Sequence, residues 1–119
     1  MKFKVLFPAG YNVNDILNDN VDINIVLESG EVYFAIFLTI LNIQYHMAKD
    51  DAHYFWSDDI LIVKDLSQQT IRETISLTLD EGILERAFTK IGRLGENGLY
   101  DGVSFQEIVD MANGYETGL

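Results

Sequence analysis

The first residues of the chain alternate between apolar and polar side chains. Phe3, Val5 and Phe7 lie between Lys2, Lys4 and Leu6, and a period of two predicts a β-strand. Pro8 and Gly10 end this strand, because proline cannot donate to a strand ladder and glycine weakens one. The two lysines favour an edge position in the sheet.

A second and clearer alternation predicts a β-hairpin. Residues 21–27 alternate between apolar and mostly polar side chains, and Ser29-Gly30 separates them from the run 32–38. Two such runs joined by a short glycine turn are typical of a hairpin. The second run is apolar at every position, so we expect it to lie in the middle of the sheet.

The remaining patterns alternate between helix and strand. Thr39, Ser67 and Ser104 are predicted N-caps, the last in a capping box with Glu107. The predicted elements are a helical turn at 14–20, a helix at 39–48, a strand at 54–63 interrupted at 57–59, helices at 67–82 and 83–91, a loop at 92–102 and a last helix ending at Gly114. This order predicts a single α+β domain over residues 1–119, a mostly antiparallel sheet with helices packed on it.

Charge restricts the partners of this domain. The chain has 19 acidic and 8 basic residues, a net charge of −11, and no Lys or Arg between Lys4 and Lys49. Nucleic acids and anionic membranes would be repelled, whereas a basic partner would be attracted. The longest nearly unbroken apolar stretch, residues 32–43, is shorter than the roughly 20 residues of a membrane span. We therefore expect a soluble, cytoplasmic protein with no nucleic-acid or membrane partner.

Candidate chemistry is sparse. The absence of cysteine excludes disulfides and thiol catalysis. His46, Asp50, Asp51 and His53 lie close in sequence, but their spacing is not an established metal-binding pattern. We therefore expect neither a metal nor another cofactor.

The pair Asp58-Asp59 interrupts an apolar segment. Paired carboxylates can act in general acid–base catalysis, but they also mark bulges, guarded edges or contacts with a basic partner. No second catalytic group accompanies them, so the structural and contact roles are favoured. The abundant aromatic side chains, Tyr54, Phe55 and Trp56 among them, are expected in the core, with one or two tyrosines free for an interface.

Two stretches resemble a known family. Residues 30–43 contain a strand with Tyr33-Phe34-Ala35 and Phe37, followed by a Thr39-capped helix with Asn42-Ile43. Residues 54–67 contain Tyr54-Phe55-Trp56, Asp59 and then Asp65-Leu66-Ser67. Over roughly residues 28–80, this pattern is similar to small bacterial immunity proteins, the antidotes of polymorphic toxin and contact-dependent growth inhibition systems. The resemblance implies a binding protein without catalysis that blocks the active site of a toxin.

Charge and resemblance together predict an immunity protein, not an enzyme, that neutralises a basic cognate toxin domain, which we expect to be a nuclease. A small hydrolase using Asp58 or Asp59 and an acidic nucleic-acid mimic are the alternatives. The carboxylates expected to face the partner are those that interrupt apolar runs or lie at the ends of elements: Glu28, Glu31, Asp50, Asp51, Asp58 and Asp59.

Overall fold

The computed structural model describes residues 1–96, 100, 102–110 and 115–117. The strands are β1 (Phe3–Leu6), β2 (Asn20–Leu27), β3 (Glu31–Leu38), β4 (Ile60–Ile62), β5 (Thr89–Arg93) and β6 (Tyr115–Thr117), and the helices are α1 (Ile40–Lys49), α2 (Gln68–Asp80), α3 (Leu84–Ala87) and α4 (Phe105–Asp110). The fold is α+β, and the sheet is mostly antiparallel, as predicted.

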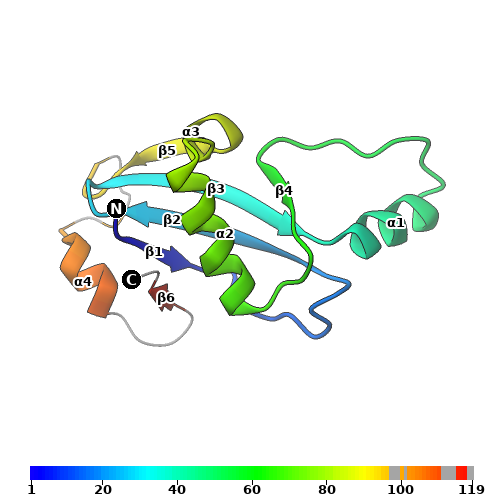
Figure 1. Cartoon of the computed structure of the whole chain (residues 1–119), viewed down its shortest axis with the longest axis horizontal. Helices are drawn as coiled ribbons and strands as arrows, with labels where there is room; N and C mark the ends of the chain where they lie inside the picture. The colour runs from blue at the N-terminus through cyan, green and yellow to red at the C-terminus, as the bar shows by residue number, and fades with distance from the viewer. Residues whose placement is uncertain (97–99, 101, 111–114, 118–119) are drawn as a thin grey trace.

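Strand β3 organises the sheet (Figure 1). One edge of β3 pairs with β2 along almost its whole length, from Val26↔Val32 to Asn20↔Leu38. The other edge is shared, because the first half of β3 pairs antiparallel with β5 and the last three residues pair parallel with β4. Beyond β2 the order continues through β1 to β6, so β3 is central, as its apolar run predicts.

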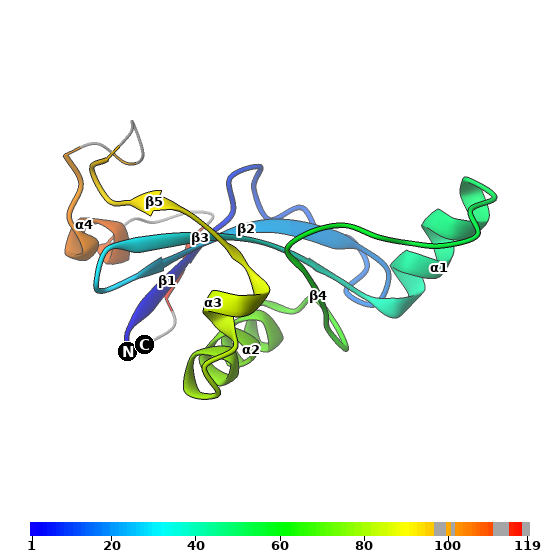
Figure 2. The ribbon, with the colours of Figure 1, turned by 90° about the horizontal axis from the view of Figure 1, so that it is seen from above.

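The two faces of the sheet bury two separate apolar clusters. The odd-numbered residues of β1, β2 and β3, such as Val5, Ile23 and Phe37, pack with residues of the segment that holds α2 and α3, which Figure 2 shows together on one side of the sheet. In α2, Ile71 and Ile75 are one helical turn apart and fully buried, and each contributes about 1.5–3 kcal/mol of burial free energy. The opposite face packs Leu6, Val26 and Val32 against Ile108 of α4.

Several predicted boundaries are confirmed. Thr39 caps α1 by accepting from the backbone N–H of Asn42, and Ser67 caps α2 by accepting from that of Thr70. Gly82 follows α2 with φ +69°, a left-handed conformation that suits glycine at a helix end. The β2–β3 turn comprises residues 28–30, one residue more than expected, with φ +104° at Gly30.

Three predicted elements are wrong. Residues 14–20 contain a turn rather than a helical segment, and the helix expected over 83–91 divides into the single turn of α3 and the strand β5. Only residues 60–62 of the strand expected over 54–63 are a strand. β5 forms because β4 covers only the last part of one edge of β3, which leaves the first part free to pair. This strand pairing outweighs the helical spacing of residues 83–91. The predicted helix end at Gly114 lies outside the described residues.

The edge position predicted for β1 is also wrong, because β6 pairs with its outer side. Lys4 is only 3% exposed, and its Nζ donates to the backbone carbonyl of Val109 at 3.2 Å. Desolvation by burial lowers the pKa of Lys4, and the nearby Asp110 carboxylate opposes that shift. This lysine therefore holds the end of α4 against the sheet rather than guarding an edge.

Ser104 supplies one half of the predicted capping box. Its hydroxyl accepts from the backbone N–H of Glu107 at 3.2 Å. We expect Ser104→Ala to lower the free energy of unfolding by about 0.5–2 kcal/mol, because α4 packs on the sheet through the fully buried Ile108. Chemical denaturation measures this loss, and Ser76→Ala at an exposed position inside α2 is the control. An unchanged midpoint would show that α4 contributes nothing to global stability.

Candidate partner-binding site

Helix α1 projects from one end of the sheet and carries an apolar surface into solvent. Figures 1 and 2 both show it standing beyond the strands, with the segment after it running back toward β4. Ile40, Leu41 and Tyr45 are each at least half exposed, although residues of this size are usually buried. We call residues 39–59, comprising the Thr39 cap, α1 and the following segment, the arm.

Asn42 anchors the arm to the sheet. It is the one buried residue of α1, and its side-chain Oδ1 accepts from Asn20 Nδ2 at 2.9 Å while its Nδ2 donates to Asn18 Oδ1 at 3.2 Å. A buried amide must find such partners, since leaving it unpaired costs about 1–3 kcal/mol. The base of the arm is therefore fixed by a polar network rather than by a hydrophobic core.

Beyond α1, the returning segment exposes three consecutive aromatic residues. Tyr54 is 77% exposed, Trp56 is 75% exposed and Phe55 is 38% exposed. The expectation that these rings pack in the core is wrong, because residues 54–56 have no strand neighbour. Tyr33 in β3 is buried as expected.

An open pocket of about 620 Å³ lies between the arm and the sheet. Asp22 and Ile36, a cross-strand pair of β2 and β3, line it from the sheet. His46 and Met47 line it from α1, and the segment from Asp50 to Ser57 supplies the aromatic side. We call this cavity the arm pocket.

Two of the predicted contact residues line the arm pocket. Asp50 is the C-cap of α1, and Asp51 follows it with φ +50°, a left-handed conformation that aspartate tolerates better than most residues. Asp58 and Asp59 lie just beyond, between Ser57 and Ile60, without belonging to the lining. The Asp59 carboxylate accepts from the Thr89 hydroxyl at 2.8 Å, and its backbone carbonyl accepts from Ile36 N at 2.8 Å.

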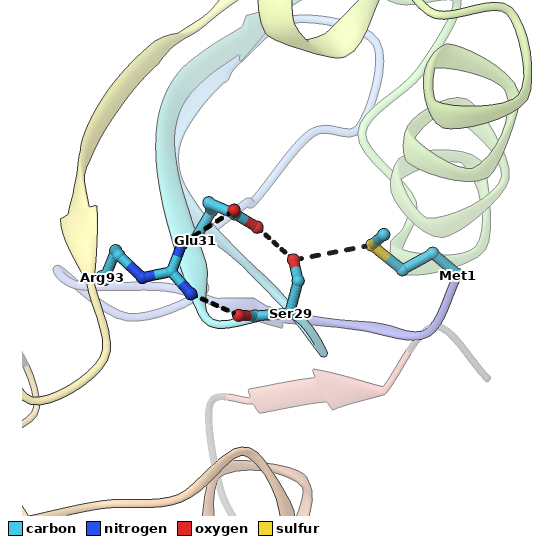
Figure 3. Close-up of polar contacts among 4 residues, drawn as sticks. All are labelled: Met1, Ser29, Glu31 and Arg93. Atoms are coloured by element: carbon cyan, nitrogen blue, oxygen red, sulfur yellow. Dashed lines mark hydrogen bonds and ion pairs between the residues drawn. The ribbon is translucent and has the colours of Figure 1, made fainter.

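The other two predicted residues are remote from this site. Glu28 and Glu31 lie at the hairpin end of β3, about 23 Å from its arm end at the rise of an extended strand. Glu31 pairs with Arg93 Nη1 at 2.9 Å and accepts from the Ser29 hydroxyl, while Arg93 Nη2 donates to the Ser29 carbonyl at 2.9 Å (Figure 3). The six carboxylates are therefore not gathered in one place. Asp50 and Asp51 line the arm pocket, Asp59 lies beside the middle of β3, and Glu31 links β3 to β5.

The hydrogen bond from the Ser29 hydroxyl is the largest cause that lowers the pKa of the Glu31 carboxyl. Burial opposes this shift in part, and the backbone N–H of Glu31 and then Arg93 lower the pKa further. Because the pKa of Glu31 is lower in the folded state than in the unfolded state, its ionised carboxylate stabilises the fold. This contribution is complete above the ordinary pKa near 4.5 and disappears as the pH falls through the folded-state pKa.

The histidines considered for a metal site, His46 and His53, both line the arm pocket together with Asp50 and Asp51. Among the described residues, no group of three or more potential ligands is arranged to hold a metal ion. In the same part of the chain, no helix combines the length and apolarity required to cross a membrane.

Comparisons with models of protein families, with curated proteins and with solved structures find no match to this chain. The site is therefore defined by its own geometry. Sequence reasoning missed the exposure of the aromatic segment, although acidic pairs enclose it on both sides, at 50–51 and 58–59. Charges at both ends of an apolar run indicate that neither end enters a core.

We expect Asn42→Ala to loosen the arm without unfolding the sheet. Removing the amide deletes its hydrogen bonds with Asn18 and Asn20, each worth about 0.5–1.5 kcal/mol. The loss should appear as faster hydrogen exchange across α1. Gln44→Ala, at an exposed position of the same helix, is the matched control. Equal exchange of α1 in both variants would show that Asn42 does not hold the arm.

We expect Glu31→Gln to lower stability at neutral pH by about 0.2–1 kcal/mol, the range of a partly exposed ion pair. The difference from wild type should shrink as the pH falls below about 4.5 and through the depressed pKa of Glu31. Denaturation midpoints across this range measure it. Glu28→Gln is the control, since its amide oxygen can still accept from the Lys2 backbone N–H, and a pH-independent deficit in Glu31→Gln would contradict the assignment.

Proposed function

We propose that this protein is an immunity protein that binds a basic cognate toxin domain one-to-one and blocks its active site. The observation that carries the proposal is the arm, where exposed aromatic side chains lie beside carboxylates at the end of a long molecule. The resemblance of residues 28–80 to bacterial immunity proteins supports it independently of this geometry.

The aromatic segment has the composition of a protein interface. Trp and Tyr are enriched among residues that dominate binding energy, because they bury a large area and retain a polar group. Trp56 and Tyr54 each expose about three-quarters of their area, which contributes no burial free energy to the folding of the monomer. A partner that covers them adds this burial free energy to the complex. The arm is therefore better explained as half of an interface than as part of a core.

The charge supports a basic partner. A net charge of −11 produces a field that accelerates encounter with a basic surface. Nucleases carry such surfaces in their substrate clefts, since they bind phosphates. An acidic arm that projects from the fold is suited to enter such a cleft.

The hydrolase alternative receives less support. Asp59 is held by Thr89, and neither Asp58 nor Asp59 belongs to the lining of the arm pocket. A general acid or base must lie within hydrogen-bond reach of a bound substrate. The arrangement favours roles for this pair in the turn before β4 and in surface charge.

We expect the double variant Asp50→Lys, Asp58→Lys to weaken binding to the toxin domain encoded beside the gene. Both residues are exposed and not in strained backbone, and a lysine suits the end of α1. The on-rate should fall by about tenfold or more at low salt, with a weaker dependence on ionic strength than in wild type. Stopped-flow binding and protection of toxin-sensitive cells are the measurements.

The matched control is Asp80→Lys, Glu85→Lys, which changes net charge equally at exposed positions of the α2–α3 layer. It should lose less binding and keep protection. Equal losses in both variants would show that total charge, not the arm, guides association. Absence of any neutralisation by the wild-type protein would refute the proposed function itself.

A further inference from the structure

The geometry points to an arginine side chain of the partner protein as the occupant of the arm pocket. We propose that its guanidinium group lies against the aromatic segment and is paired with the pocket carboxylates. The identity of the partner rests on the proposed function, whereas the preference of the pocket for a guanidinium group does not.

The first argument is the charge of the lining. Asp22, Asp50 and Asp51 line the pocket from β2 and from the end of α1, and among the described residues its lining includes no Lys or Arg. The other titratable side chains of the lining are His46 and His53. Three carboxylates around one concavity favour a cationic occupant over a neutral or an anionic one.

The second argument is the aromatic side of the pocket. Tyr54, Phe55 and Trp56 contribute to the lining while remaining substantially exposed. Aromatic faces attract cations, Trp most strongly, and arginine is found against them more often than lysine. The planar guanidinium group stacks on rings and binds carboxylates through two parallel hydrogen bonds, whereas the ammonium group of lysine is a strongly hydrated point charge.

The third argument is the shape of the pocket. Its volume of about 620 Å³ is within the range of pockets that enclose small ligands. Ile36 and Met47 add apolar surface to the lining, against which the methylene stem of an arginine can pack. One cavity thus offers apolar surface for the methylene groups of an arginine and carboxylates for its guanidinium group.

The test uses the intact wild-type protein and four capped tripeptides, Gly-X-Gly, with X as arginine, lysine, citrulline or leucine. Trp56 is the single tryptophan of the chain, which also has six tyrosines, so tryptophan fluorescence, excited selectively, reports on this pocket. Citrulline is the neutral isostere of arginine and isolates the effect of charge. The arginine peptide should bind about tenfold more tightly than the citrulline and leucine peptides, and more tightly than the lysine peptide.

The variant Asp22→Asn, Asp50→Asn, Asp51→Asn keeps Trp56 as the reporter, and asparagine tolerates the backbone of residue 51. It should reduce arginine-peptide binding to the level of citrulline, whereas Asp80→Asn, Glu85→Gln should not. Equal binding of arginine and citrulline, tighter binding of leucine, or no saturable signal with any peptide would overturn the proposal. So would self-association that buries Trp56, because a second copy would then be the occupant.

These peptides are tested without toxin, so the two proposals fail separately. Arginine binding by a protein that protects no cell would refute only the proposed function. Protection by a protein whose pocket shows no preference for arginine would refute only the pocket assignment.

Discussion

The parallel pairing of β3 with β4 is the constraint on which the rest of the structure depends. Parallel neighbours cannot be joined by a tight turn, so the chain must leave the end of β3 and return to pair with the same strand in the same direction. In most such connections the crossover helix packs on a face of the sheet. Here the connection is the arm, and α1 projects beyond the strands with Asn42 as its buried residue.

This connection separates the core from the proposed recognition site. The helices that cover the sheet are α2, whose Ile71 and Ile75 are fully buried, and, on the opposite face, α4 with Ile108. The core is therefore complete without α1. Its apolar side chains remain available, and so do the aromatic rings that follow it. Because surface substitutions away from a core usually change stability little, the arm can vary in sequence while the sheet is kept.

Charge and aromatic area have different physical tasks in such a site. Exposed carboxylates act over about 8–10 Å at physiological salt and mainly raise the rate of encounter. Aromatic side chains that become buried on binding act only on contact and mainly lower the rate of dissociation. The arm carries carboxylates and exposed aromatic rings within residues 50–58, so under the proposed function one short segment supplies both fast association and a long-lived complex.

The sequence predicted the parts of the fold that are specified locally. The strands of the β2–β3 hairpin follow from a period of two, and the caps at Thr39 and Ser67 follow from hydroxyl groups placed before helical runs. The errors concern partners distant in sequence. Residues 89–93 form a strand because the first half of one edge of β3 is free to pair with them. Lys4 is buried because β6 pairs with β1 and α4 packs beside it. Tyr54–Trp56 have strand-like composition, yet without a neighbouring strand their propensity has no effect.

The same dependence on residues distant in sequence explains why only part of the candidate site was predictable. Asp50 and Asp51 are adjacent in sequence and line the arm pocket together, whereas Asp59 is held beside the middle of β3 by Ile36 and Thr89. Glu28 and Glu31 belong to the opposite end of β3, where Arg93 compensates one of them. An acidic nucleic-acid mimic would need its charges to continue across the surface at phosphate-like intervals. Scattered carboxylates with exposed aromatic rings beside only one pair of them fit the proposed protein partner better than such a mimic.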